Sequence, residues 1–562
     1  MRSRGVAVMA LGLVAAACSS AGPAASSRPT SPPVTIATTP RSAPTVTSVT
    51  STTSSTPSST GTSETVSTSA TAATTSAVTT TAATTTSVAS LAGPPAAPPA
   101  PICGSSALQG GPASPPEGAV VVPAGDDTDL MDSATSRPDT IFWFAPGVHT
   151  IGHGKTAQII PADGQSFIGA PGAVLDGQHV NKYAFTQHAQ KVRIAYLEIR
   201  NFGRPGADGN EGVVNHDSGE GWVIEHDDIH DNAGAGAFVG TRGVLRDNCI
   251  RDNGQYGFQG IGAGGESSAV DVVVDHNEIA HNNTDDWETR QPGCGCSGGA
   301  KFWQVVGAKV TNNYVHDNLG VGLWADNDNA DFLFEGNWIE NNAAEAIMYE
   351  ISYNATIRFN TIKGNTMKLG GSFARRNDTF PVPTVYISES GGDDRVQGLP
   401  VIDIHDNLFD NNWGGVTVWE NADRFCGIDT AAACTLVASS AAGCKAGTVN
   451  VPPNYDDCRW RAKNVRVHDN EFRFDPKALG CVVGVCGRQA LLSNFGTYPD
   501  WSPYKATTIQ ESITFHQDDR WFANHYTGPW RFTAYESTRT FDRATWVAAP
   551  YGQEVGSTFA AS

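Results

Sequence analysis

The chain has 562 residues, with 37 Lys and Arg against 57 Asp and Glu, and a formal net charge of −20 at pH 7. An acidic balance of this size argues against nucleic acid and anionic lipid surfaces as partners, because both repel a negatively charged protein. The sequence also lacks a phosphate-binding loop of the Gly-x4-Gly-Lys-Ser/Thr type, so a nucleotide partner is not expected.

The first 18 residues are typical of an exported lipoprotein. Arg2 and Arg4 precede an apolar run over residues 6–17, which is too short to span a membrane and ends in three alanines before Cys18. This order resembles a bacterial lipobox, so we expect acylation of Cys18 and an extracellular position on the outer face of the envelope membrane. The usual Leu three residues before the cysteine is Ala15, and secretion without a lipid is the alternative.

Residues 19–101 consist almost entirely of Ser, Thr, Ala, Pro and Val. Such a composition has no apolar period and cannot bury enough surface to offset the entropy of ordering the chain. We therefore predict a disordered linker that tethers the folded part. When stretched, about 80 residues of this kind reach on the order of 200 Å.

The folded region is predicted over residues 102–562 and begins with short β-rich runs between residues 120 and 177. After it, one six-residue phrase recurs: Asn or Asp, any residue, Ile/Val/Phe, two residues, Asn or Asp. A period near 23 residues suits one turn of a coiled sheet, in which the Asn tolerates left-handed backbone geometry and stacks in a ladder inside the coil. The copies begin at Asp227, Asn248, Asn277, Asn313, Asn337, Asn360, Asn407 and Asn470.

Several of these segments resemble right-handed parallel β-helix proteins of the pectate-lyase-like superfamily. The resemblance is carried by VPAG, FAPGVHTI and DGQSFIGAPGAVLDG, by the repeated phrase, and by TFDRATWVAAPYGQEVGST (Thr540–Thr558), which is similar to a closing segment of secreted bacterial carbohydrate-active proteins. It covers roughly residues 119–558 and implies an all-β, right-handed parallel β-helix. Lyases, hydrolases, epimerases and structural coils share this fold, so the resemblance leaves the chemistry open.

Apart from Cys18 the chain has ten cysteines, and an even number in an exported protein favours disulfides over zinc. Four of them lie in a Cys-rich insertion at about residues 422–464 that interrupts the repeat. The pair Cys294 and Cys296 has no partner pair at zinc-finger spacing, so a zinc site is not expected there.

A second β-rich run follows each phrase, and polar residues recur in it at nearly one offset. Residues at one offset of a parallel coil stack in a row about 4.8 Å apart. We expect Lys301, Asp326, Glu350, Glu389 and Glu420 to share such a row, although they are scattered over about 120 residues. Buried parallel strands are mostly apolar, so this row predicts a functional site.

Two chemistries suit the row. In a glycoside hydrolase, Asp326 and Glu350 form the carboxylate pair. In a calcium-dependent polysaccharide lyase, Lys301 is the base, and hard oxygen ligands from Asp326, Asn327, Asp328 and Glu350 bind Ca²⁺. The acidic wall favours hydrolysis of a neutral polysaccharide, which needs no cofactor.

Aromatic and acidic neighbours complete the predicted substrate-binding set: Trp303, Trp324, Asp328, Tyr349, Glu389, Trp419 and Glu420. The tryptophans are equally compatible with the interior core, because alternation buries every second residue of a strand. A noncatalytic glycan-binding or structural surface protein is the alternative, since exposed carboxylates also prevent strand edges from pairing. In an enzyme the residues must converge; in a structural coil they are splayed or capped by loops. An extra loop, QPGCGCS from Gln291, directly precedes the Lys301 run.

Overall fold

The computed structural model describes residues 93–561 except 129–135, 153, 155–156, 187–188, 205–218, 263–267, 293–294, 421–453, 455–457, 459–460, 494–509 and 536. The predicted signal segment with Cys18, nearly all of the predicted linker and most of the Cys-rich insertion lie outside these residues. No helix in the described part of the chain is long and apolar enough to cross a membrane.

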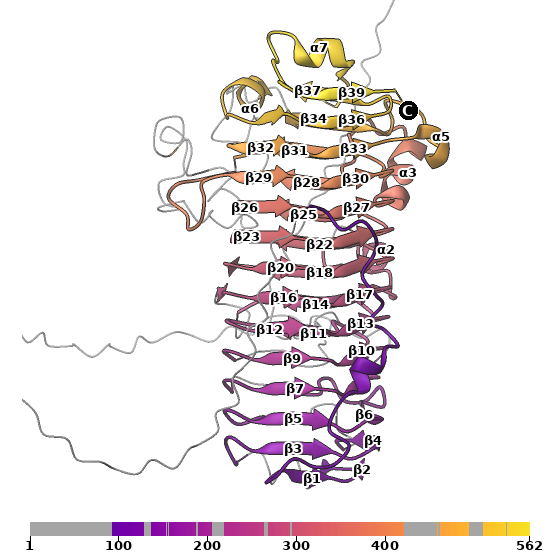
Figure 1. The fold of residues 1–562 in the computed structure, drawn as a ribbon, viewed down its shortest axis with the longest axis vertical. Coiled ribbons are helices and arrows are strands. Elements are labelled where there is room, and N and C mark those ends of the chain that lie inside the picture. Colours follow the sequence, from indigo (N-terminus) through magenta and orange to yellow (C-terminus); the bar gives the residue numbers. More distant parts are fainter. Residues whose placement is uncertain are drawn as a thin grey trace, which may run out of the picture. The chain divides into compact units, whose positions relative to one another are not determined.

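The described residues form a coil of three parallel sheets, and from β11 (Ala237–Val239) onward a full turn adds at least one strand to each sheet (Figure 1). The predicted all-β, parallel β-helix is therefore confirmed. Parallel strand pairing joins each turn to the next. For example, Asp228 is paired with Cys249, and Cys249 is paired with Glu278 of the following turn. One pair, between the last two strands of the third sheet, is antiparallel.

The first sheet has 15 strands: β1 (Val120–Val122), β3 (Ile141–Phe144), β5 (Ser166–Gly169), β7 (Arg193–Ala195), β9 (Val223–Glu225), β12 (Val244–Arg246), β15 (Ala269–Val270), β16 (Val273–Asp275), β19 (Val305–Val306), β20 (Lys309–Thr311), β23 (Ala330–Glu335), β26 (Tyr353–Arg358), β29 (Ile402–His405), β32 (Val465–His468) and β35 (Arg520–Phe522).

The second sheet has 14 strands: β2 (Gly125–Asp126), β4 (Gly147–Thr150), β6 (Ala173–Asp176), β8 (Glu198–Arg200), β10 (Asp228–His230), β13 (Cys249–Arg251), β17 (Glu278–Ala280), β21 (Tyr314–His316), β24 (Trp338–Glu340), β27 (Thr361–Lys363), β30 (Leu408–Asp410), β33 (Glu471–Arg473), β36 (His525–Thr527) and β39 (Thr558–Ala560).

The third sheet has ten strands: β11, β14 (Tyr256–Gly260), β18 (Gly298–Trp303), β22 (Val321–Asp326), β25 (Ile347–Glu350), β28 (Val385–Ser388), β31 (Val416–Glu420), β34 (Arg488–Ser493), β37 (Arg531–Tyr535) and β38 (Thr540–Phe541). The described helices are short: η1 (Ser106–Gln109), α2 (Trp287–Arg290), α3 (Met367–Arg375), α5 (Pro476–Leu479), α6 (Gln510–Phe515) and α7 (Arg543–Val547).

The core lies inside the coil, where apolar residues of successive turns stack. The central residue of each repeated phrase points inward, and Ile250, Ile279 and Val315 are fully buried. Aromatic residues continue such a column toward the C-terminal end, with ring centroids 4.5 Å apart for Phe409 and Phe472 and 4.9 Å apart for Phe472 and Tyr526. These spacings are close to the distance between neighbouring strands, so each turn buries its apolar residue against the next.

A ladder of buried asparagines confirms the predicted stacking. Asn313 shows the pattern: its Nδ2 donates to Asn337 Oδ1 at 3.0 Å and to Val274 O at 3.0 Å, while its Oδ1 accepts from the backbone and side chain of Asn277. Every polar atom of the amide is thus satisfied inside the coil. The ladder runs through Asn248, Asn277, Asn313, Asn337, Asn360, Asn407, Asn470 and Asn524.

The last position of the phrase forms a second ladder on the other side of the second sheet. Its members are Asn232, Asn253, Asn282, Asn318, Asn342, Asn365 and Asn412. The prediction that the ladder asparagines themselves adopt left-handed backbone geometry is wrong. Positive φ falls instead on the residue before each asparagine, as in Asn312 (56°), Asp317 (52°) and Phe359 (54°). The turn is made there because the amide itself must point into the coil.

Residues 93–119, called the N-terminal strap below, run along the second sheet against the chain order (Figure 1). Near its start Pro95 O accepts a hydrogen bond from Thr361 in β27. Near its end Pro112 O accepts from Trp143 Nε1 in β3, at 2.8 Å. The strap therefore contacts many turns before the chain enters the coil at β1.

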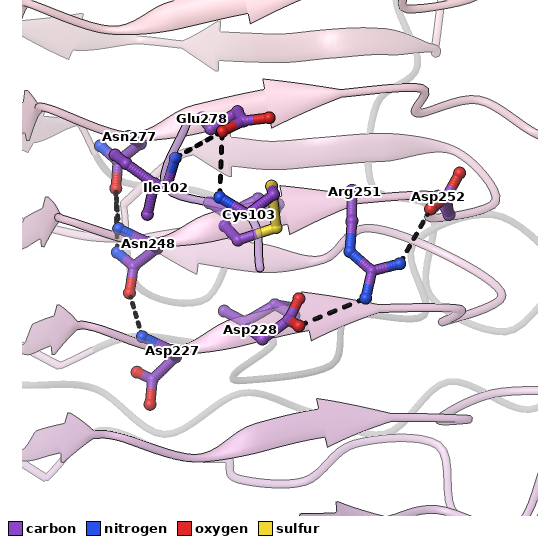
Figure 2. Close-up of a disulfide and its surroundings, with 12 residues drawn as sticks. Ile102, Cys103, Asp227, Asp228, Asn248, Arg251, Asp252, Asn277 and Glu278 are labelled. Carbon is purple, nitrogen blue, oxygen red and sulfur yellow. Dashed lines mark hydrogen bonds and ion pairs between the residues drawn. A yellow bond between two sulfur atoms is a disulfide. The ribbon is translucent and has the colours of Figure 1, made fainter. Parts of the chain in front are cut away.

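The middle of the strap is fixed covalently (Figure 2). Cys103 is disulfide-bonded to Cys249 in β13, which is 146 residues away in sequence. Next to this bond the backbone N–H groups of Ile102 and Cys103 donate to Glu278 Oε2 at 2.7 and 3.0 Å. A second disulfide joins Cys481 and Cys486.

The segment Thr540–Thr558 closes the last turn of the coil. Trp546 of α7 is fully buried, and its ring stacks on Phe532 with centroids 5.5 Å apart. The same ring meets Trp521 edge-on at 6.2 Å. The helix thus covers apolar residues that a further turn of the coil would otherwise bury.

Candidate functional site

The outer face of the third sheet brings together the two carboxylates of the predicted pair. Asp326 of β22 and Glu350 of β25 are directly opposite in register, on strands about 4.8 Å apart. Both are buried, with 4% and 2% of their surface exposed. Their neighbours Ala325 and Tyr349 belong to the interior core, so strand alternation turns the carboxylates outward.

Lys301 of β18 supplies a positive charge beside this pair. Its Nζ lies 2.8 Å from Asp326 Oδ2, and both side chains are about 95% buried. The same ammonium lies 4.0 Å from the ring centroid of Trp324 and 5.5 Å from that of Trp303. The ammonium is thus held between one carboxylate and two aromatic faces.

The predicted extra loop covers the lysine. Gly295 O accepts a hydrogen bond from Lys301 Nζ at 2.5 Å. A Cβ added to Gly295 would lie 2.8 Å from the Trp324 ring, and the residue has a φ of +55°. Glycine is required here because the loop backbone packs directly on the indole. The residues therefore converge as in an enzyme, while one of them is capped as in a structural coil.

The predicted single row is wrong in part. Asp326 and Glu350 share a register position with Ser388 and Trp419. Lys301 stands two residues earlier, opposite Trp324, and Trp303 holds the position opposite Asp326. Glu389 and Glu420 stand one residue further, directly after β28 and at the end of β31. Glu389 accepts from the Ser388 hydroxyl. Glu420 is bound elsewhere, because its Oε2 accepts from Ala462 N and from Gln517 Nε2, at 3.2 and 2.8 Å.

Tyr349 is also corrected, from a substrate-binding residue to a core residue. Its ring packs against Phe332 and Phe334 inside the coil, and its hydroxyl donates to Tyr353 O at 2.7 Å. Burial and the charge of Asp331 raise its pKa well above the ordinary value. Tyr349 follows the inward positions of the strand and cannot reach a ligand outside.

The three predicted tryptophans lie outside the interior core. Trp324 is 4% exposed beneath the loop, whereas Trp303 and Trp419 are partly exposed. Trp419 stacks on Tyr386 with ring centroids 6.1 Å apart. Trp303 and Trp419 are thus the members of this group that a ligand can reach.

The predicted calcium ligands Asp326, Asn327, Asp328 and Glu350 lie at the ends of β22 and β25 and in the turn after β22. Asn327 and Asp328 have φ angles of 60° and 55° and make the turn after β22. Within the part of the chain that the structure describes, Asp326, Asp328 and Glu350 do not bring three ligand atoms within 4.8 Å of one another. One Asp326 oxygen is also engaged by Lys301.

Two further acids, Glu288 and Glu345, were not predicted from the sequence. Glu288 of α2 accepts from the Ser297 hydroxyl at 3.2 Å, and burial raises its pKa. Burial, together with the charge of Glu288, raises the pKa of Glu345 to about 7. Glu345 comes directly before the run that contains Glu350, but it does not occupy the position of the repeat at which the polar residues of the predicted row recur. Glu288 belongs to the inserted segment, which has no counterpart in the repeat.

Tyr386 of β28 connects several of these acids. Burial and the charges of Glu389, Glu350 and Glu345 raise its pKa well above the ordinary value, against a hydrogen bond with Ser388. The tyrosine therefore keeps its proton and remains a hydrogen-bond donor. The outer face of β18 to β31 thus combines a buried carboxylate pair, one lysine, a tyrosine hydroxyl and two reachable indoles.

Residues 211–380 match the family model described as the right handed beta helix region. The coil therefore has the right-handed parallel β-helix fold. The match includes Lys301, Asp326 and Glu350 and agrees with the three parallel sheets. No match was found among curated proteins.

Several solved structures show distant similarity to this chain. The A-module of mannuronan C-5 epimerase AlgE4 from Azotobacter vinelandii is 13% identical, covers 63% of this chain and 86% of its own, and gives a TM-score of 0.35. The catalytic unit of a GH87 alpha-1,3-glucanase from Streptomyces thermodiastaticus is 13% identical, with 80% and 68% covered and a TM-score of 0.32. Pectate lyase Pel9A is 11% identical, with 54% and 77% covered and a TM-score of 0.26.

Proposed function

We propose that the chain is a polysaccharide-cleaving glycoside hydrolase that acts at the outer face of β18, β22 and β25. The observation that carries the proposal is the directly paired, buried Asp326 and Glu350 with Lys301 beside Asp326. Burying three charged groups is costly unless they are used or fully paired. A structural coil has no need for such a group on its outer face.

The arrangement supports a division of roles between the two carboxyl groups. Asp326 is the carboxyl group in contact with the Lys301 ammonium, and we assign it the role of nucleophile or of base that activates water. Glu350 lies directly opposite Asp326 on the neighbouring strand, and we assign it the role of the general acid that gives a proton to the glycosidic oxygen as the bond breaks.

The surroundings favour a neutral polysaccharide. Carboxylates outnumber the one lysine, so a uronate chain would be repelled unless a cation were bound. Trp303 and Trp419 are partly exposed and offer apolar faces to sugar rings. The lyase alternative has less support, because Lys301 Nζ is paired with Asp326 and covered by Gly295 O.

The test is reducing-end release by the full chain on a panel of neutral and acidic polysaccharides. We expect Asp326→Asn and Glu350→Gln each to lower the rate at least about 1,000-fold, while thermal unfolding stays cooperative. Glu471→Gln, a surface carboxylate that is paired with Arg473, is the matched control and should leave the rate unchanged. Full activity in both site variants would exclude the site.

Two other results would point to different functions. An unsaturated uronate product that chelator abolishes would support the calcium-dependent lyase. Saturable binding of a polysaccharide without any product would support a noncatalytic surface protein.

We further propose that the chain is exported and anchored to the outer face of the bacterial membrane through Cys18. The disulfides Cys103–Cys249 and Cys481–Cys486 support an oxidising compartment, because such bonds are rare in the cytosol. Labelled fatty acid should be incorporated by the full chain and not by Cys18→Ala. Equal labelling of both would contradict the anchor.

A further inference from the structure

A corner of the second sheet gathers two imidazoles and a carboxylate. His281 directly follows β17, and His316 and Asp317 stand at and after the end of β21, the neighbouring strand. One ligand atom from each of the three side chains lies within 4.8 Å of the other two. His316 is buried, whereas His281 and Asp317 are exposed, so the group opens to solvent on one side.

A histidine followed by an aspartate is, by itself, part of the scaffold. His230 Nδ1 contacts Asp231, His405 Nδ1 contacts Asp406, and His468 Nδ1 contacts Asp469, all within 2.8 Å. The aspartates of these pairs occupy the left-handed turn position. The pair of His316 and Asp317, at 2.8 Å, repeats this arrangement and alone indicates no ligand.

The corner at His230 differs from that at His316 in one residue that matters for a metal. In both corners the histidine Nε2 faces a glutamate of the preceding turn, Glu198 at 3.4 Å or Glu278 at 3.3 Å. In the first corner the residue after the preceding strand is Asn201. In the second it is His281, which adds a third ligand and makes no other side-chain hydrogen bond or ion pair among the described residues.

The glutamate behind His316 is fixed as a supporting carboxylate. Glu278 Oε1 faces His316 Nε2, and Oε2 accepts from the backbone of Ile102 and Cys103 (Figure 2). Tyr314 stacks on the His316 ring with centroids 4.0 Å apart and holds its plane. Metal-binding histidines typically donate their second N–H to a carboxylate in this way, which leaves the other nitrogen for the ion.

We propose that His281, His316 and Asp317 form a Zn²⁺ site, with His316 binding through Nδ1 and water completing the coordination. Two imidazole nitrogens and one carboxylate oxygen are a common zinc set. The ligand atoms must move, because metal–ligand bonds of about 2.0 to 2.2 Å hold neighbouring ligand atoms roughly 3.4 Å apart. His316 Nδ1 and Asp317 Oδ2 are 2.8 Å apart and would exchange this contact for bonds to the ion. The exposed His281 ring allows this movement, because it meets His316 only edge-on, at 5.6 Å.

The test is titration of the metal-free full chain with zinc chloride by calorimetry. We expect one ion per chain, and at least a tenfold weaker affinity in His281→Asn, which reproduces the chemistry of the Asn201 corner. His230→Ala is the matched control and should bind zinc as the wild type does. With Co²⁺ in place of Zn²⁺, the wild type should show the absorption bands of a four-coordinate ion, and His281→Asn should not.

Glu278→Gln distinguishes a positioning role from a ligand. It should weaken zinc binding by about 10- to 100-fold, while the stoichiometry remains one. Zinc affinity that is unchanged in His281→Asn, or a wild type that binds no ion stoichiometrically, would overturn the proposal. Thermal unfolding of each metal-free variant checks that the coil is intact.

Discussion

The asparagine ladder and the charged outer face of the third sheet are both buried and polar, yet they are built on opposite principles. In the ladder each amide meets an identical amide of the next turn, and every donor and acceptor is used. At one offset of the third sheet the residue type changes from Trp303 to Asp326 to Glu350 within three turns. Identical residues at one offset indicate scaffold, whereas a change of chemistry from turn to turn indicates a site.

The difference also predicts what each region contributes to the free energy. A satisfied amide ladder stabilises the coil, because removing one member leaves its partners buried without hydrogen bonds. A buried carboxylate cluster stabilises little, because the cost of dehydration offsets the attraction to one lysine. The ladder should therefore govern folding, and the cluster should govern activity and pH dependence.

The largest expected effect on stability comes from breaking the ladder. Asn313→Ala removes the donor to Asn337 and Val274 and the acceptor for Asn277. We expect the free energy of unfolding to fall by about 4 kcal/mol, because buried groups lose their partners. Denaturant unfolding measures this change, while the activity per folded molecule should stay at the wild-type level.

Lys309→Ala is the control, because Lys309 is exposed on a neighbouring strand of the same turn. Its free energy of unfolding should change by less than about 0.5 kcal/mol. A loss below about 1 kcal/mol in Asn313→Ala would remove the distinction between the two regions.

A smaller effect, with a defined pH dependence, is expected at Glu345. Its pKa is raised to about 7, first by burial and then by Glu288, whereas an unfolded glutamate titrates near 4.5. Between these values the native state retains a proton that the unfolded state has lost, so stability falls as pH rises. Above pH 7 the full penalty is at most about 3 kcal/mol.

Glu345→Gln cannot ionise, so its stability relative to wild type should increase between pH 4.5 and about 7.5. Urea unfolding at the two pH values measures the difference. Glu471→Gln, at a surface carboxylate, corrects for a general change of charge. A difference between Glu345→Gln and wild type that is independent of pH would show that Glu345 is not protonated in the folded state.

The fold was predictable because its signal is repeated. Asn248, Asn277 and Asn313 mark successive turns, and the structure places each at one position of the ladder. Asn524 was missed because Tyr526 and Pro529 break the phrase, although the amide still extends the ladder. The phrase therefore identifies typical turns and misses the terminal ones.

The site was predictable only where residues stay in strict register. Asp326 and Glu350 lie in equal positions of neighbouring strands, so their pairing follows from the repeat. Glu420 lies one residue beyond its expected place and binds Gln517, from a distant segment. Glu345 and Gly295 contribute through burial and close packing. Neither leaves a periodic signal in the sequence.

The N-terminal strap determines where a mechanical load would enter the molecule. A pull on the chain before residue 93 would first act beside Thr361 in β27 and would peel the strap from the second sheet. At Cys103 the disulfide would transfer the force to Cys249 in β13. The chain between these two cysteines, which forms β1 to β12, would then be bypassed and free of tension. The bond thus acts as a force shunt that protects the first turns of the coil while the later turns bear the load.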